Sequence, residues 1–252
     1  MKKWLLTALC TLILIPLLPA EVFRFAYTKG EKYRITSTVE ETVTINGRFN
    51  SRNDILNKIA VEVTDAKDGA GYHKADFQSS TRLYGSDGSY ELSDDYQSEF
   101  WRDERGVFTI DDGYFMPTVR DVPLFPEGDV AIGQTWTAQG SEAHDFRRDF
   151  GVLNAFHFPI TVSYAYLRNE TRNGVPCAVF SAEYTIFYKV PKAPPTTNRY
   201  PIRITGESHQ LYWWDLQNKK YSYAEETFDF IFTLDSGDEV EFAGTSLSLI
   251  HI

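Results

Sequence analysis

Four side chains able to ligate a metal lie close together in the middle of the chain. His144, Asp145, Asp149 and His157 fall within fourteen positions and offer imidazole and carboxylate donors. Zinc sites use three or four strong ligands at close and regular spacing, and this group lacks such a pattern. The sequence therefore predicts a structural hydrogen bond from a histidine to a carboxylate or to the backbone, and it predicts no metal ligand.

Nucleophilic catalysis needs a serine, a cysteine or a similar group with a base within hydrogen-bond reach. The sequence holds no Gly-x-Ser-x-Gly motif, no Ser-x-x-Lys motif and no phosphate-binding glycine loop. Cys177 lies in an apolar segment, which favours a buried thiol, and the pairs Asp94-Asp95 and Asp111-Asp112 are typical of turns and strand ends. His73 and His209 stand alone on predicted strands, where we expect them at the surface or satisfied in the core. We therefore predict no catalytic residue, no cofactor and no enzyme.

The chain is rich in aromatic residues. The chain has 18 Phe, 15 Tyr and 5 Trp, with clusters at Tyr212-Trp213-Trp214, at Phe100-Trp101 and along the alternating series that begins at Phe228. Each ring buries a large apolar area, so these rings can fill the core of a large sheet. A cleft that holds a lipid or an acyl chain needs the same composition. The sequence leaves a packed core and a hollow core both open.

The elements that must carry these residues are β-strands. Between Tyr33 and Ile45, apolar residues recur at every second position on one face, while threonines and charged residues occupy the other. This alternation is typical of an antiparallel strand with one buried face and one wet face. Asn46-Gly47 follows at once and can supply the two positive φ angles of a type I′ hairpin.

The same period returns along most of the chain. A second hairpin signal is Asn173-Gly174, and Pro191–Pro201 holds four prolines, which predicts a loop because proline cannot donate to a sheet ladder. The further predicted strands cover residues 55–64, 72–84, 160–166, 178–190, 208–214, 221–234 and 239–245.

These patterns predict an all-β fold, an antiparallel meander that forms a sandwich or a strongly curved sheet in one large domain, residues 21–246. Residues 94–158 differ from the rest. Their short extended pieces with prolines and large apolar residues, from Met116 to Trp136, predict an ordered crossover that joins two sheet halves and seals the interior. Two alternatives stay open. One is a pair of domains divided at this segment, and the other is a transmembrane barrel whose outward-facing side chains contact lipid.

Residues 1–20 have the pattern of a secretory signal peptide. Lys2 and Lys3 precede an apolar run that is too short to span a bilayer, and Leu18-Pro19-Ala20 fits a cleavage site. Cys10 lacks a good lipobox before it, so a lipoprotein is the lesser alternative. The mature chain then has Cys177 as its one thiol and is more acidic than the whole chain, whose net charge is −10. Such a charge argues against nucleic acid as a partner.

The last six residues, 247–252, have the sequence Leu-Ser-Leu-Ile-His-Ile, which is the translation of CTG-TCT-CTT-ATA-CAC-ATC. These codons match the end of a transposon-based sequencing adapter. We therefore expect the segment to be an artefact, His251 to carry no function and the natural protein to continue beyond Ser246. The alternative is a natural apolar strand.

Several motifs resemble the N-terminal β-domain of bacterial OmpA-family envelope proteins. They are Met116–Pro126, Gly133–Trp136, Glu142–Phe146 and Phe25–Tyr33. In that family a β-rich region precedes an OmpA-like domain that commonly binds peptidoglycan. The resemblance implies a periplasmic, outer-membrane-associated fragment without its OmpA-like domain, so the peptidoglycan-binding residues fall on no position of this chain.

The expected function is that of a non-enzymatic structural or interaction module of the cell envelope. It would dock to an envelope protein or to an outer-membrane component, and it would reach peptidoglycan only through the missing domain. The alternative function is a periplasmic carrier of a lipid or of another hydrophobic ligand, which would need a hollow interior.

Overall fold

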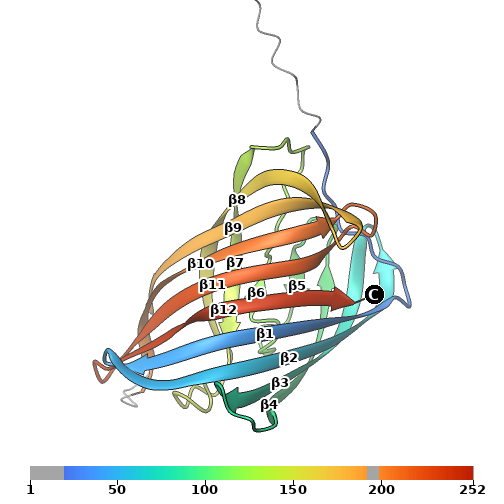
Figure 1. Cartoon of the computed structure of the whole chain (residues 1–252). Helices are drawn as coiled ribbons and strands as arrows, with labels where there is room; N and C mark the ends of the chain where they lie inside the picture. Colours follow the sequence, from blue (N-terminus) through green and yellow to red (C-terminus); the bar gives the residue numbers. More distant parts are fainter. Residues whose placement is uncertain (1–19, 192–198, 252) are drawn as a thin grey trace, which may run out of the picture.

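The computed structural model describes residues 20–191 and 199–251, whose strands form one antiparallel sheet (Figure 1). The prediction of an all-β meander in a single domain is confirmed, in the form of one strongly curved sheet. The strands are β1 (Lys32–Ile45), β2 (Arg48–Lys67), β3 (Ala70–Leu83), β4 (Glu91–Arg102), β5 (Phe108–Ile110), β6 (Val119–Arg120), β7 (Thr135–His144), β8 (Phe156–Arg172), β9 (Val175–Lys189), β10 (Pro201–Asp215), β11 (Lys220–Leu234) and β12 (Glu239–His251).

Tight hairpin turns connect the long strands. Asn46 and Gly47 have φ angles of 52° and 70°, and Asn173 and Gly174 have φ angles of 50° and 81°. Two successive positive φ angles give a turn whose twist matches that of the flanking strands. Both predicted hairpins, β1–β2 and β8–β9, are therefore confirmed.

The strand order places the first and the last strand side by side in the middle of the sheet. The order is β5-β4-β3-β2-β1-β12-β11-β10-β9-β8-β7-β6. The chain moves outward from β1 to β5 at one edge, crosses through residues 111–118, and returns from β6 at the other edge to β12. In Figure 1 the long strands curve around the front, and β5, β6 and β7 lie behind them. The middle of the chain is thus an ordered crossover, as predicted.

Contacts across this crossover bring the two edges together, although the described residues form no ladder between β5 and β6. The backbone amide of Phe108 in β5 donates to the carboxylate of Asp121, one residue after β6, at 2.6 Å. The hydroxyl of Tyr96 in β4 donates to the carboxylate of Asp145, one residue after β7, at 2.7 Å. The sheet therefore nearly closes on itself, with side-chain bonds along its seam.

Aromatic side chains fill one end of the curved sheet. Phe125 is 1% exposed, and its ring centroid lies 4.8 Å from that of Trp214, 5.5 Å from that of Phe180 and 5.6 Å from that of Phe23. Phe25 packs on the same tryptophan at 4.8 Å. We call these five residues the aromatic plug. It joins the N-terminal segment to the segment after β6, so the predicted sealing role of residues 116–136 is confirmed at this end.

The inner faces of β8 and β9 are tightly packed. Their buried residues recur at every second position along β8 up to Tyr166 and along β9 from Phe180, which confirms the predicted alternation there. At the start of β9, Cys177 and Val179 are buried as well, in a separate cluster with Trp213 and Tyr223. Side chains from the segment after β7 pack against the inner faces of both strands. The inward residues of β8 and β9 that are at most 5% exposed are Phe156, Phe158, Ile160, Val162, Tyr164, Tyr166, Ala178, Phe180, Ala182, Tyr184 and Ile186.

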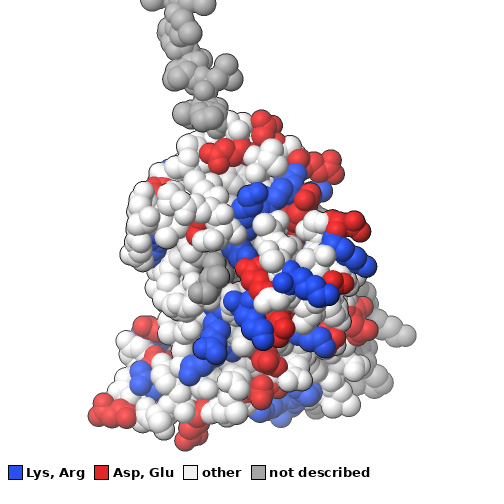
Figure 2. All heavy atoms as spheres, turned by 90° about the vertical axis from the view of Figure 1, so that its right-hand side faces the viewer, with Lys and Arg blue, Asp and Glu red and all other residues white. Residues whose placement is uncertain are grey.

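The outer face of the sheet is largely polar. Lys32 pairs with Glu62 at 3.1 Å, and Lys74 pairs with Glu99 at 2.7 Å. Figure 2 shows a face of the molecule on which basic and acidic side chains are interspersed. Exposed pairs of this kind contribute little to stability individually. In the described residues, no helix is long and apolar enough to cross a membrane.

The structure corrects several boundaries. The strands predicted at 55–64, 160–166 and 208–214 are longer, since β2, β8 and β10 begin at Arg48, Phe156 and Pro201. Residues 94–158, predicted as short extended pieces, include most of β4 and all of β7, which are full members of the sheet. The last strand extends to His251 instead of ending at 245, because the two-residue period continues through Leu247 and Leu249 and these residues pair with β1. The adapter origin of residues 247–252 stays a prediction.

Two predictions concern residues that the structure does not describe. The predicted signal peptide, residues 1–20 with Cys10, falls outside the described residues apart from Ala20. Residues 192–198, the larger part of the predicted loop Pro191–Pro201, fall outside them as well.

Candidate functional site

The interior of the curved sheet is hollow on one side. A cavity of about 560 Å³ lies against the inner faces of β1, β2, β11 and β12, opposite residues 116–119 and the end of β7. Its volume falls within the range of small-molecule sites in proteins. Its apolar lining includes Ile35, Val39, Ile55, Phe228, Phe230 and Phe242.

Partial exposure of inward side chains separates this hollow side from the packed side. Phe230 and Phe242 face the interior, yet they keep accessible surface, whereas Tyr184 on the packed side is only 4% exposed. Phe228 of β11 also faces the interior and keeps accessible surface. Deep side chains with free surface border a space that protein atoms do not fill.

A polar network crosses the wall of this cavity. The hydroxyl of Tyr184 in β9 donates to Glu142 of β7 at 2.7 Å. Ser208 and Gln210 of β10 donate to Glu226 of β11 at 2.8 Å and 2.9 Å. Buried polar groups need such partners, and here neutral donors supply them. The network places two carboxylates, Glu142 and Glu226, in the lining of a largely apolar space.

The charge of Glu226 is not compensated by protein cations. Burial raises the pKa of Glu226, the bonds from Ser208 and Gln210 lower it, and the nearby carboxylate of Glu142 raises it again. Within the described part of the chain, Glu226 forms no ion pair. Glu142, by contrast, lies with its Oε2 2.6 Å from Nε2 of His144. The interior therefore disfavours the ionised form of Glu226.

A second hollow of about 740 Å³ adjoins the cavity at the end of the sheet opposite the aromatic plug. Both spaces are lined by Glu41 and Asp149, and burial raises the pKa of each of these carboxyl groups. Arg148 also lines the second hollow, where it pairs with Asp94 at 3.2 Å. We call this space the polar vestibule, and it links the apolar cavity to the charged end of the sheet.

Replacement of Glu226 by glutamine tests this electrostatic description. The raised pKa means that ionised Glu226 destabilises the fold as pH rises above the ordinary glutamate pKa, and that this cost disappears as pH falls back toward 4.5. We expect Glu226→Gln to raise the free energy of unfolding by about 1 kcal/mol in mildly alkaline buffer, relative to its effect near pH 4.5. Urea unfolding at both pH values measures this difference.

The matched control is Glu207→Gln, since Glu207 is exposed on the outer face of β10. We expect this control to change the unfolding free energy by less than about 0.5 kcal/mol at either pH. A Glu226→Gln variant that loses stability as the buffer becomes alkaline, relative to the parent chain, would contradict the description.

Two of the four metal-ligating candidates, His144 and Asp145, lie next to each other in the wall of the cavity. The predicted bond between a histidine and a carboxylate is confirmed at His144, which contacts Glu142 and stacks between Phe146 and Phe158. Asp145 accepts bonds from the guanidinium of Arg147 and from Tyr96. These bonds make His144 and Asp145 parts of the seam and of the cavity wall.

The other two candidates are placed apart from them. Nε2 of His157 lies 2.9 Å from the carbonyl oxygen of Asp112, and Asp149 lies in the vestibule. Across residues 20–191 and 199–251, no three His, Cys, Asp or Glu side chains are placed to hold a metal ion.

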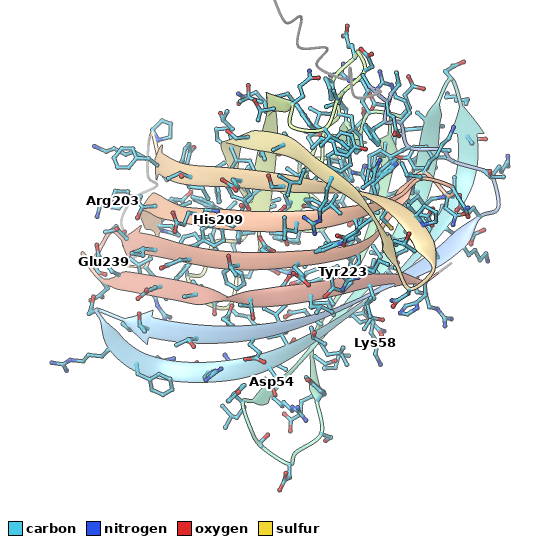
Figure 3. All side chains as sticks on the ribbon, turned by 45° about the horizontal axis from the view of Figure 1, so that its top comes forward. Asp54, Lys58, Arg203, His209, Tyr223 and Glu239 are labelled. Atoms are coloured by element: carbon cyan, nitrogen blue, oxygen red, sulfur yellow. The ribbon has the colours of Figure 1, made fainter. Side chains whose placement is uncertain are left out.

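The remaining candidates have structural positions. Cys177 is 1% exposed, which confirms the buried thiol, and burial raises its pKa. His73 is 1% exposed, with Nδ1 2.9 Å from the carbonyl oxygen of Gly71, and burial lowers its pKa to about 4. His209 lies on the outer face of β10, 3.7 Å from Glu207 (Figure 3). His73 thus lies in the core and His209 at the surface, the two environments that were predicted for these histidines.

The two acidic pairs differ from each other. Asp111 accepts a bond from the amide of Gly113 at 2.7 Å, which confirms its predicted role in a turn. Asp94 and Asp95 lie inside β4 rather than in a turn, because their strand begins three residues earlier than Asp94, at Glu91. Asp94 faces inward and reaches the vestibule.

Two carboxylates of the cavity wall, Glu142 and Glu226, were not singled out from the sequence. A signal for Glu226 exists, since it occupies the same two-residue register as Phe228, Phe230 and Phe232 and therefore breaks an otherwise apolar inward series. Glu142 has no comparable signal, because its burial depends on Tyr184, which is distant in sequence.

The chain has no match among family models or curated proteins and only weak similarity to a solved structure. One solved structure with similarity is a Bacteroides fragilis protein that is described as exported and as having a YmcC-like fold. It is 13% identical, with 90% of this chain and 97% of that chain covered and a TM-score of 0.36. Similarity this low supports no statement about the function of the chain.

The comparison with family models overturns the resemblance to OmpA-family proteins. No family model matches the chain, and so none of the OmpA family does. The motifs behind the resemblance have structural roles instead: residues 116–126 form the seam and part of the aromatic plug, and Trp136 stacks on Tyr164 at 5.1 Å. Prolines and aromatic residues at such positions arise from packing needs that unrelated β-proteins share.

Proposed function

We propose that this chain is a carrier of small hydrophobic molecules that works outside the cytoplasm. The observation that carries the proposal is the cavity of about 560 Å³ behind half-buried phenylalanines, opposite the tightly packed inner faces of β8 and β9. Apolar side chains that face an unfilled space gain free energy when a ligand removes them from water. The signal-peptide pattern of residues 1–20 supports the location.

Several features support reversible binding over catalysis. The polar side chains of the cavity wall bond to each other, and Ser208, whose hydroxyl donates to Glu226, is 0% exposed and therefore out of reach of a substrate. The aromatic plug fixes one end of the sheet, whereas the vestibule end is lined by polar side chains. A ligand held by apolar contact beneath a polar vestibule fits transport or storage.

An interaction module of the cell envelope is the second candidate. It is supported by single large apolar residues on the surface, such as Phe187, which is 81% exposed on β9, and Phe49, which is 70% exposed on β2. These residues are isolated from the cavity, so the two functions make different predictions about ligands.

Native mass spectrometry distinguishes the two candidates. We expect the chain purified from a bacterial periplasm to carry one bound apolar molecule, because the interior offers one cavity-sized apolar space in the described residues. The delipidated chain should then bind the neutral dye N-phenyl-1-naphthylamine with a saturable rise in fluorescence. A bare mass together with no saturable dye signal would contradict the carrier function and favour the interaction module.

A further inference from the structure

The cavity lining favours a ligand whose headgroup carries a positive charge. This inference rests on the proposed carrier function. The lining contains the carboxylates Glu41, Glu142, Asp145, Asp149 and Glu226, of which Glu142 and Glu226 lie beside the phenylalanines of β11, and neither lysine nor arginine is among the described residues that line the cavity. The one basic side chain in the lining, His144, already contacts Glu142. The interior thus presents an excess of negative charge to any ligand.

Aromatic rings lie next to these carboxylates. Phe228 and Phe230 stack with ring centroids 5.9 Å apart, and Phe230 stacks on Tyr184 at 6.4 Å. Tyr184 is the residue that donates to Glu142. The negative faces of aromatic rings attract ammonium groups, and rings combined with carboxylates recognise alkylammonium ligands. The rings and the carboxylates therefore favour the same kind of headgroup by separate physical effects.

The carboxylates of the lining would repel an anionic headgroup. Charges interact more strongly in a protein interior than in water, so a fatty acid carboxylate near Glu226 would be repelled. The vestibule does not reverse this effect, because its two arginines, Arg148 and Arg199, share it with the carboxylates of Glu41, Asp94, Asp149 and Asp238.

We infer that the ligand is an apolar molecule with a protonated amine, whose ammonium group lies beside Glu226 and Glu142 while its hydrocarbon part contacts Phe228, Phe230 and Phe242. Glu226 is the main partner, because it has neutral hydrogen-bond donors but no cation among the described residues. The ammonium group would supply the missing positive charge.

Three probes of equal chain length test the headgroup preference: dodecylamine, dodecanol and dodecanoate, each titrated calorimetrically below its micelle concentration. We expect dodecylamine to bind at least about tenfold more tightly than dodecanoate, with dodecanol between them. Glu226→Gln should weaken dodecylamine binding about tenfold and leave dodecanol binding unchanged, and the outer-face control Glu207→Gln should change neither.

The possible results separate this inference from the carrier function. Binding of dodecanol with dodecanoate equal to or tighter than dodecylamine would overturn the headgroup preference and leave the carrier function standing. An unchanged dodecylamine affinity in Glu226→Gln would overturn the role of Glu226. Absence of binding by all three probes would overturn the carrier function and the inference with it.

Discussion

Phe125→Ala should lower the free energy of unfolding by about 3–5 kcal/mol, the range for loss of a fully buried phenylalanine. Phe125 is 1% exposed, and its ring contacts those of Phe23, Phe180 and Trp214 in the aromatic plug. Truncation removes contacts with the N-terminal segment and with two strands at once, so little of the space can be refilled. Equilibrium unfolding in urea, followed by tryptophan fluorescence and by circular dichroism, measures the loss.

Phe187→Ala is the matched control for this prediction. Phe187 is also a strand-flanking phenylalanine, but it is 81% exposed on the outer face of β9. Its truncation should change the unfolding free energy by less than about 0.5 kcal/mol. Equal effects of the two substitutions would show that the plug does not hold the end of the sheet together.

Val39→Phe should reduce binding of N-phenyl-1-naphthylamine at least about tenfold while the fold remains intact. Val39 faces the cavity from β1, between Ile55 of β2 and Ser246 of β12 in the register of the sheet. The added ring occupies ligand space without displacing a packed neighbour. Filling an existing cavity commonly stabilises a protein, by about 0.5–2 kcal/mol, so the variant should unfold at the same or a higher urea concentration.

The control places the same ring on the other side of the same strand. Thr38 is the preceding residue of β1 and is exposed on the outer face, so Thr38→Phe should leave dye binding unchanged. Dye binding that survives in Val39→Phe, or that falls equally in Thr38→Phe, would place the binding site outside the cavity.

Much of the fold follows from local sequence patterns. The period of two between Tyr33 and Ile45 predicts which side chains face inward, and Asn46-Gly47 and Asn173-Gly174 predict two hairpins that the structure contains. These signals are local, since alternation and turn chemistry act over a few residues. The pairing of β1 with β12 is not local and has no comparable signal in one sequence.

The cavity could not be predicted for a related reason. Phe158 and Phe230 have the same alternating apolar neighbours in the sequence, yet Phe158 is 1% exposed and Phe230 borders the cavity. The difference depends on what lies across the interior. Side chains from the segment after β7 cover β8 and β9, and no equivalent segment among the described residues fills the space opposite β1 and β12.

The contacts of the seam could not be predicted from the sequence either, because they join residues that are far apart along the chain. One of the motifs behind the incorrect family resemblance, Met116–Pro126, lies at this seam. Tyr96 and Asp145 meet across the closing edges although 49 positions separate them. The proline-rich and aromatic motifs of residues 116–126 are conspicuous in the sequence because they build this closure. Their composition reports a packing role, and packing roles are shared by proteins of different families.

A crystal of the chain soaked with a bromine-labelled dodecanol would show whether the interior of the curved sheet is hollow. We expect one anomalous bromine peak inside the curved sheet, between Val39 and Ile55 on one side and Phe230 and Phe242 on the other. A peak only on the outer face, or an interior filled by protein side chains, would contradict the account.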